Sequence, residues 1–304
     1  MVNLLLIIIS SLFFTGIISK VKAKIAARKM PSILQPLYDV IRLFKKGTIY
    51  GENISFIFKL APIIYFSSII IASLFIPVCD KAGILSFQGD FIFFAYLLGF
   101  GKFMMIIGAM DTGSGFEGMG ANREVLYSML VEPAFFILFA SMALFTNNIS
   151  FNDFFTSYHA SNNLSYAISF ISIFILVYIA MVENSRMPVD DPKTHLELTM
   201  VHEVMVLDNS GFDLALIHIS TWLKFSIYGA LISNFVIQGI WPYYIKIIVF
   251  FITQTVFALI IGIMESFKAR NKLEKNPQWI IMLSAIAVII FLTTLIFTNK
   301  IILD

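Results

Sequence analysis

The sequence predicts an all-α integral membrane protein with about eight transmembrane helices, a short interfacial amphipathic helix and a polar cytoplasmic loop. Two features of the composition indicate a membrane protein: 59% of the 304 residues are hydrophobic, and only 13% are charged. With a mean hydropathy of +0.87, the chain is too apolar for a protein whose whole surface faces water. The third observation is a recurrence of long apolar runs, which sets the number of helices.

These apolar runs are long enough to cross a bilayer. A hydrocarbon core of about 30 Å is crossed by about 20 helical residues, and a helix satisfies its own backbone hydrogen bonds in lipid. No linker divides the runs into groups, so residues 1–304 are predicted to form a single polytopic membrane domain. The runs are 1–19, 59–78, 91–110, 124–146, 164–182, 214–236, 243–265 and 278–299.

The distribution of basic residues predicts the orientation. Of the 21 Lys and Arg, 15 lie in the four segments that follow the odd-numbered runs, 20–58, 111–123, 183–213 and 266–277. Such an excess marks the cytoplasmic side, so both termini are predicted outside. No charge precedes the first run, and lysines follow it. This is the reverse of a signal peptide, and we expect a retained first span.

Two polar segments near the first and third spans were considered as binding sites. The basic segment 20–29 sets topology, or binds anionic lipid or an acidic partner. The glycine-rich segment 111–124, DTGSGFEGMGANRE, lacks the Gly-Lys-Ser/Thr ending of a phosphate loop, and no strand precedes it. We therefore expect a tight turn there between the third and fourth spans.

Residues 36–46 predict the interfacial helix, because their apolar and charged side chains segregate with helical periodicity. The helix either rests on headgroups as a connector or grips a partner. The apolar side contains Leu37, Val40, Ile41 and Phe44, and the opposite side contains Asp39, Arg42, Lys45 and Lys46.

The sequence offers little for a metal or haem. A single cysteine, Cys79, excludes an intramolecular disulfide and any cluster or zinc site built from thiolates of this chain. Among four histidines only His218 falls within a predicted span. His202-Glu203 begins like a zinc-protease helix, but Val206 stands where the second histidine belongs. No metal site and no cofactor are predicted in this chain, and redox chemistry is assigned to other polypeptides.

Charged residues inside the spans are the main functional signal. Glu132, Lys102 and Lys224 lie well within the fourth, third and sixth runs, where a charge costs on the order of 3 kcal/mol or more. They predict a buried relay for protons or other ions. The alternative is a structural ion pair, such as Glu132 with Lys102. Glu183 and Glu265, at the inner ends of the fifth and seventh runs, would connect the relay to the cytoplasm.

The loop between the fifth and sixth spans concentrates the remaining ionisable residues. Pro188 and Pro192 predict a tight turn over 186–192, and the following residues predict a helix that ends at the Asn-Ser-Gly of 209–211. Carboxylates this close to a membrane are costly unless they meet water, cations or another subunit. We expect a proton entrance that includes Glu203 and a docking surface for a soluble partner. The docking candidates are Arg186, Asp190, Asp191, Lys193, His195, Glu197 and Asp208.

The charged segments also carry a resemblance that covers essentially the whole chain. ENSR with PVDDPKTHLELTMVHEVMVLDNSG, DTGSGFEGMGANREV with EPA, and KAKIAARKMPSILQPLYDVIRLFKK resemble the membrane subunits of energy-converting nickel–iron hydrogenases, the formate hydrogenlyase subunit 4 / hydrogenase-4 component C family. This family is similar to a membrane subunit of complex I, which is called subunit 1 in the mitochondrial enzyme. The complex I pattern E-x-x-R-x-P-x-D-x-P is kept here, whereas Lys193 and His195 replace acids. That departure favours the hydrogenase branch over quinone binding.

The resemblance implies a non-catalytic subunit of the prokaryotic inner membrane. Its partners would be hydrogenase large and small subunits with a Ni–Fe centre, iron–sulfur subunits, antiporter-like membrane subunits and lipid, with no nucleic acid. It would link electron transfer in this arm to proton or sodium movement, and Glu132 matches a glutamate assigned to the family's proton path. Two alternatives stay open. Bound quinone would indicate the quinone-chamber subunit of a complex I-like NADH dehydrogenase, and ion flux through the isolated chain would indicate a secondary transporter, although its hallmark inverted repeats are absent.

Overall fold

The computed structural model describes residues 2–51, 54–158, 163–190, 200–237, 239–268 and 271–298. Within these residues, eight helices are long and apolar enough to cross a membrane, which confirms the predicted number. They are α1 (Val2–Ile25), α3 (Phe56–Ser73), α4 (Asp90–Asp111), α5 (Gly115–Thr146), α7 (Asn163–Glu183), α9 (Gly211–Val236), α10 (Tyr243–Phe267) and α11 (Lys275–Phe297).

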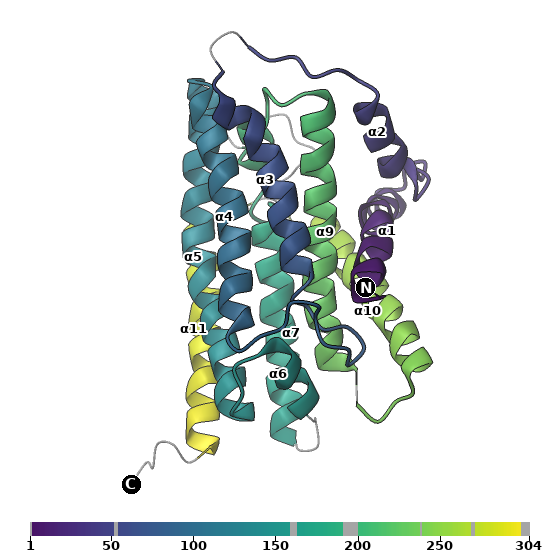
Figure 1. Cartoon of the computed structure of the whole chain (residues 1–304), viewed down its shortest axis with the longest axis vertical. Coiled ribbons are helices and arrows are strands. Elements are labelled where there is room, and N and C mark those ends of the chain that lie inside the picture. The colour runs from purple at the N-terminus through teal and green to yellow at the C-terminus, as the bar shows by residue number, and fades with distance from the viewer. Residues whose placement is uncertain are drawn as a thin grey trace.

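The long helices form a bundle around α9 (Figure 1). α3 packs on α4, α5 on α11 and α1 on α10, while α9 contacts α1, α3, α7 and α10. Accordingly, 83% of the most apolar window of α9 is buried, against 33% in α10 and 28% in α11. α10 and α11 therefore present most of their length to the surroundings, and α9 carries its polar side chains into the interior.

A short amphipathic helix, α2 (Gln35–Phe44), lies against α9 and confirms the predicted helix at 36–46. Its buried residue Val40 meets Ala215 and Trp222, with Leu37 and Leu43 packed beside them. Ile41, predicted on the apolar side, is 41% exposed, because the packed side of α2 centres on Val40.

The chain after α2 is fastened to the beginning of α9. The Tyr50 hydroxyl donates a hydrogen bond of 2.7 Å to Asp213, and the Ile49 amide donates one of 3.0 Å to the Ser210 hydroxyl. Burial raises the pKa of Tyr50 above its ordinary value, so the phenol stays a donor at neutral pH. These contacts hold α2 and its neighbouring segment over the α9 side of the bundle.

The glycine-rich segment 111–124 is mostly helical, so the predicted tight turn is confined to its first residues. α5 begins at Gly115 and continues without interruption into the membrane-spanning part. A Cβ at Gly120 would lie 2.8 Å from the Val201 carbonyl oxygen. The glycine therefore serves close packing of α5 against the short helix α8 (His202–Met205) rather than a reversal of the chain.

The end of the polar loop also differs from the prediction. Ser210 occupies the N-cap position of α9, and Gly211, with φ of +53°, is the first residue of that helix. A Cβ there would collide with the backbone of Gly47. Asn-Ser-Gly thus begins α9 instead of ending a preceding helix. In the described part of 193–208, only α8 is helical, and residues 191–199 lie outside the described ranges.

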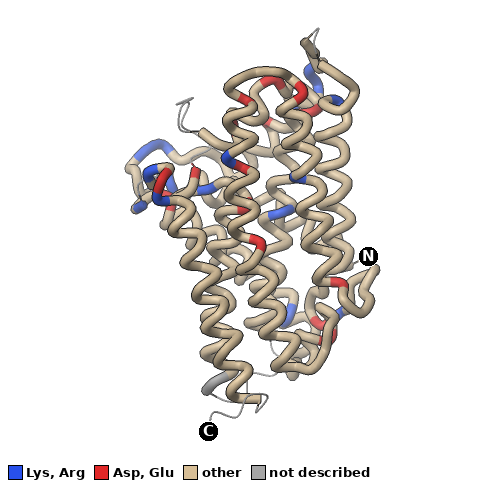
Figure 2. The backbone as a smooth tube through the Cα atoms, turned by 90° about the vertical axis from the view of Figure 1, so that its left-hand side faces the viewer, with Lys and Arg blue, Asp and Glu red and all other residues tan. Residues whose placement is uncertain are grey.

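Most charged positions gather at the upper end of the molecule in Figure 2, with a smaller group near the lower end. The upper end contains the starts of α5 and α9 and the end of α4 (Figure 1). A few charged positions lie between the two ends of the tube. The buried relay candidates Lys102 and Lys224 lie nine residues before the end of α4 and thirteen residues after the start of α9.

Candidate functional site

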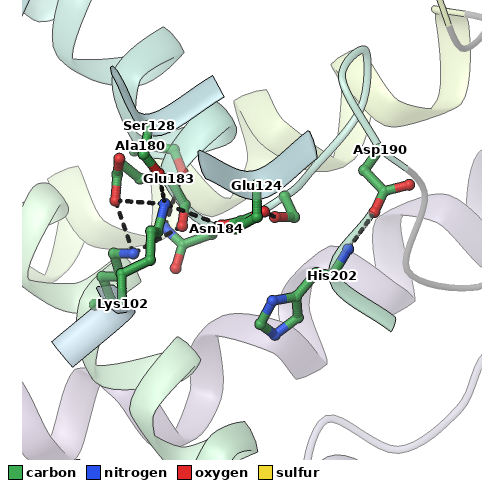
Figure 3. Close-up of polar contacts among 10 residues, drawn as sticks. Lys102, Glu124, Ser128, Ala180, Glu183, Asn184, Asp190 and His202 are labelled. Carbon is green, nitrogen blue, oxygen red and sulfur yellow. Dashed lines mark hydrogen bonds and ion pairs between the residues drawn. The ribbon is translucent and has the colours of Figure 1, made fainter. Parts of the chain in front are cut away.

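Four charged side chains from four helices meet inside the bundle. Lys102 of α4 lies 3.0 Å from Glu124 of α5 and 3.1 Å from Glu183 at the end of α7. The Glu183 carboxylate also lies 2.8 Å from the ammonium group of Lys224 on α9. Figure 3 shows the side chains of Lys102, Glu124 and Glu183 converging, with Ser128 accepting a hydrogen bond of 2.8 Å from Lys102. We call Lys102, Glu124, Glu183 and Lys224 the central cluster.

The central cluster is buried and electrically balanced. Its four side chains are 8%, 3%, 10% and 1% exposed, in the order Lys102, Glu124, Glu183 and Lys224. Two ammonium groups face two carboxylates, so the group carries no net charge when all four are ionised. Buried charges are tolerated when each is paired and hydrogen-bonded. The arrangement therefore holds four charges inside the membrane domain as long as each keeps its partner.

The end of α7 explains why Lys224 lies here. The last carbonyl groups of a helix lack an intrahelical partner, and Glu183 is the final residue of α7. Its carbonyl oxygen accepts a hydrogen bond of 2.8 Å from Lys224. One residue thus supplies both a carboxylate and an unsatisfied carbonyl to the same ammonium group.

Glu132 is placed differently from the other predicted relay residues. It lies on the exposed surface of α5, and the alternative of an ion pair with Lys102 is not formed, because Lys102 is paired with Glu124 and Glu183. A small cavity nevertheless connects them: Glu132, Lys102 and Glu183 all line it, together with Ser128 and Tyr228. Its volume accessible to water is about 40 Å³, which is room for two or three water molecules.

A second, larger cavity lies on the other side of the α7 end. Asn184, Ser185 and Arg186 line it beside α8, α9 and α2, and its volume by the same measure is about 260 Å³. The Asn184 Oδ1 and Thr15 Oγ1 atoms, both from lining residues, are buried without a hydrogen-bond partner in the described chain. Such atoms are usually satisfied by water or a ligand. The cavity thus has unsatisfied polar atoms within a mixed polar and apolar lining, and we call it the α2–α9 cavity.

The α2–α9 cavity contains further predicted residues. Arg186, Glu203 and His218 line its wall with His202 and Asp39. The Ser185 hydroxyl donates a hydrogen bond of 3.1 Å to Glu124. Because Glu183 lines the small cavity and its neighbours line the large one, the central cluster separates the two cavities at the end of α7.

Glu265 forms a separate buried group near this wall. Its carboxylate lies 2.9 Å from Lys22 and 3.4 Å from Arg186, with its own side chain fully buried. Arg186 also lies over the Phe225 ring, 5.1 Å from its centre. These contacts join the inner ends of α1 and α10 to the segment after α7. Among the described residues, no ion pair joins this group to the central cluster.

The remaining docking candidates differ in exposure: one is buried, one is exposed and four lie outside the described residues. Asp190 is 1% exposed, and its carboxylate accepts hydrogen bonds from the amides of Val201 and His202 at 3.0 and 3.1 Å, as Figure 3 shows for His202. Asp208 is exposed. The Asp190 carboxylate thus binds backbone amides at the start of α8 and is not exposed to a partner. Asp191, Lys193, His195 and Glu197 lie outside the described residues.

Removal of the Asp190 carboxylate should loosen α8. In Asp190→Ala, two buried amides lose their acceptor, and we expect a loss of about 1–3 kcal/mol in local stability. Hydrogen exchange at Val201 and His202, followed by mass spectrometry of the purified protein, measures this directly. Asp208→Asn, an exposed neighbour, is the control. Unchanged exchange in Asp190→Ala would contradict the assigned role.

Sequence reasoning missed Glu124 and Ser128 as members of the site. Glu124 is the first residue of a predicted span, where a carboxylate can be expected to face water and so gives no sign of a buried role. The signal was its spacing: Glu124, Ser128 and Glu132 recur every four residues, which puts them on one side of a helix. All three residues lie within the predicted run 124–146, so this signal was available in the sequence. Among the described residues, no group of three or more His, Cys, Asp or Glu could hold a metal ion.

Comparison with known proteins gives two sets of sequence relatives. The chain is 27% identical to hydrogenase-4 component C of Escherichia coli (strain K12) over 208 residues, which is 67% of this chain and 63% of that protein. Formate hydrogenlyase subunit 4 of the same organism is 24% identical over 276 residues, 87% of each chain. NADH-ubiquinone oxidoreductase chain 1 of Chondrus crispus is 25% identical over 78% of this chain and 73% of its own length.

The fold has a counterpart among solved structures. A chain of the membrane-bound sulfane sulfur reductase, an archaeal respiratory membrane complex, superposes with a TM-score of 0.78 at 19% identity, covering 95% of this chain and 98% of that one. The resemblance found in the charged segments is thus confirmed for both branches. Residues 1–299 match the NADH dehydrogenase family, and the chain belongs to that family.

Proposed function

We propose that this chain is the membrane-anchoring and coupling subunit of a hydrogenase-type respiratory complex, similar to formate hydrogenlyase and hydrogenase-4. It links electron transfer in a peripheral Ni–Fe and iron–sulfur arm to translocation of protons or sodium ions. The homologues and the similar solved chain are parts of respiratory membrane complexes, and this chain is likewise a membrane subunit of such a complex. The electron-transfer centres belong to the partners.

One observation carries the coupling role: a buried, charge-balanced cluster lies between two cavities. The α2–α9 cavity is lined by the residues that follow α7, and the small cavity leads from Glu183 to Glu132. A structural ion pair would need neither cavity. The arrangement supports a relay in which the arm acts from the first cavity and the ion leaves towards the second.

The chemistry of the relay follows from the contacts of Glu183. While Glu183 is ionised, it holds Lys102 and Lys224 together. A proton that reaches Glu183 from the α2–α9 cavity cancels its charge, and the two ammonium groups then repel each other in a medium of low dielectric constant. Transfer of that proton through the small cavity to Glu132 restores the balance. Each cycle moves one positive charge from the α7 end to the α5 surface.

The exposed position of Glu132 indicates where the ion goes next. A carboxylate at membrane depth faces a partner or a polar interior more readily than lipid. We infer that an antiporter-like membrane subunit covers this part of α5 and accepts the ion. The soluble large, small and iron–sulfur subunits dock elsewhere, over the segment 183–211 and the mouth of the α2–α9 cavity.

The α2–α9 cavity also favours a second candidate function, the quinone-chamber subunit of a complex I-like dehydrogenase. Its volume of about 260 Å³ is close to the lower end of the range for small-molecule sites, and its lining combines Trp222 and Leu43 with His218 and Asp39. A quinone would supply two-electron, two-proton chemistry there, with these polar side chains holding its carbonyl groups. Lipid extraction from the purified complex distinguishes this candidate, because bound quinone is expected only in that case.

The composition of the intact complex tests the favoured function. We expect a mild-detergent purification through this chain to recover a large subunit that contains nickel, with iron–sulfur subunits, by mass spectrometry and nickel assay. Recovery of NADH-oxidising subunits with quinone would replace it by the second candidate. If the chain is recovered alone, both candidates fail, and ion flux through the isolated chain in liposomes becomes the next measurement.

A further inference from the structure

The last turn of α1 and the segment after it enclose a basic cavity outside the site described above. Lys22, Arg28 and Lys29 line it, together with the hydroxyl-bearing residues Ser19 and Ser266. Its volume is about 940 Å³ including the open mouth. Three cations and two hydroxyl groups around one hollow are the donor set of an anion site.

The backbone explains why these cations face each other. Ala27 has a left-handed φ of +51°, the Ala27 amide donates to the Lys24 carbonyl oxygen at 3.2 Å, and the Arg28 amide donates to that of Ala23 at 2.9 Å. This pair of bonds is a Schellman motif, which ends a helix and reverses the chain. Arg28 and Lys29 are therefore carried back over the last turn of α1.

The reversed segment continues down the side of α1. Gly16 lies so close to Ile33 that a Cβ on the glycine would overlap the Ile33 carbonyl oxygen. Gly16 precedes the end of the helix by nine residues, or about 13 Å at 1.5 Å per residue. The segment 26–33 is thus fixed beside the last turns of a membrane-spanning helix.

The charges of the cavity are only partly neutralised. Lys22 is paired with Glu265 at 2.9 Å. In the part of the chain that the structure describes, no carboxylate lies within 4.0 Å of the Arg28 or Lys29 side chain. The carboxyl end of α1 supplies about half a negative charge, which leaves an excess of positive charge for a bound anion.

Apolar neighbours identify the source of that anion. Ile25 and Met30 are 41% and 52% exposed beside the cations, and Phe267, which follows Ser266, is 76% exposed. An acidic segment of a soluble protein would leave these side chains in water, whereas lipid glycerol and acyl groups cover them. We propose that this cavity binds the phosphate of an anionic phospholipid headgroup, from the leaflet on the basic side of the protein.

The test compares two pairs of exposed basic residues. The complex is purified through this chain and reconstituted in nanodiscs of phosphatidylcholine with or without phosphatidylglycerol, and retained lipid is counted by native mass spectrometry. Because each basic residue near an anionic surface strengthens binding roughly fivefold, we expect Arg28→Gln/Lys29→Gln to retain phosphatidylglycerol roughly 25-fold less. Lys45→Gln/Lys46→Gln, which removes two exposed lysines after α2 that do not line the cavity, should reduce retention much less.

A competition arm separates a lipid headgroup from a free anion. Inorganic phosphate added to the nanodiscs should not displace phosphatidylglycerol, because it lacks the glycerol and acyl groups that Ile25 and Met30 contact. Full displacement by inorganic phosphate would overturn the lipid assignment. Equal retention by the two double variants would overturn the site itself, and thermal unfolding of both variants verifies that they are folded.

Discussion

Glu183→Gln is expected to cost the protein about 3–5 kcal/mol of stability, the usual loss when one member of a buried ion pair is removed. Glu183 is the carboxylate shared by both lysines of the central cluster, at 3.1 Å from Lys102 and 2.8 Å from Lys224. After the change, Lys102 retains Glu124, but Lys224 keeps only the Glu183 carbonyl oxygen. The cluster then holds one uncompensated positive charge away from water. Thermal and denaturant unfolding of the protein in detergent measure the loss.

A double-mutant cycle distinguishes charge balance from lost packing. Lys224→Met alone leaves the cluster with one excess negative charge, whereas Glu183→Gln with Lys224→Met restores neutrality through the remaining Lys102–Glu124 pair. Because contacting residues are coupled, the double variant should lose less than the sum of the single variants by about 1 kcal/mol or more. Additive losses would show that net charge does not govern the stability of this cluster.

The pair of Asp80 and Lys246 is a matched control for this cycle. Asp80 is 33% exposed in its ion pair with Lys246, near the opposite end of the bundle from the polar loop. Partly exposed pairs contribute about 1 kcal/mol or less. Asp80→Asn should therefore change stability much less than Glu183→Gln, so that a large loss in the latter can be assigned to burial.

The sequence was sufficient to predict the membrane helices, because their signal is local. Twenty apolar residues in a row have one low-energy arrangement in a bilayer, whatever lies beside them. The amphipathic helix was predicted for the same reason, since the periodicity of residues 36–46 is visible in one turn after another. Its packed side was predicted less well, because contact between Val40 and Trp222 joins residues far apart in the chain.

The partners within the site could not be predicted from sequence in the same way. A pair of Lys102 with Glu132 was the structural alternative to a relay, but the crossing of α4, α5 and α7 brings Glu124 and Glu183 to Lys102 instead. The tertiary arrangement decides which of several carboxylates reaches a lysine. The spacing of residues within one helix does not predict which carboxylate on another helix that will be. Asp190 shows the same limit: its sequence position is that of a surface loop, yet local amides enclose it.

Glu132→Gln is expected to reduce coupled ion translocation by about tenfold or more, since the side chain can no longer take up and release a proton. Electron transfer from the arm to an artificial acceptor should stay unchanged, because Glu132 lies on the exposed surface of α5 and does not line the α2–α9 cavity, over which the arm is proposed to dock. Stability should also stay nearly unchanged: in the described chain, no Lys or Arg lies within 4.0 Å of Glu132. Ion uptake by proteoliposomes that contain the whole complex is the measurement.

Two further variants make this outcome specific to a titrating carboxylate. Glu132→Asp keeps the acid and should retain part of the translocation, whereas Glu274→Gln removes an exposed carboxylate at the start of α11 and should leave translocation intact. If Glu132→Gln translocates ions normally, the small cavity between Glu132 and Glu183 is not the exit of the relay. A loss of both translocation and electron transfer would instead make Glu132 a structural residue of the assembly. A loss of translocation alone, with electron transfer and stability unchanged, would assign the onward transfer of the ion to Glu132. The residues of the central cluster would then be the ones that hold the buried charges.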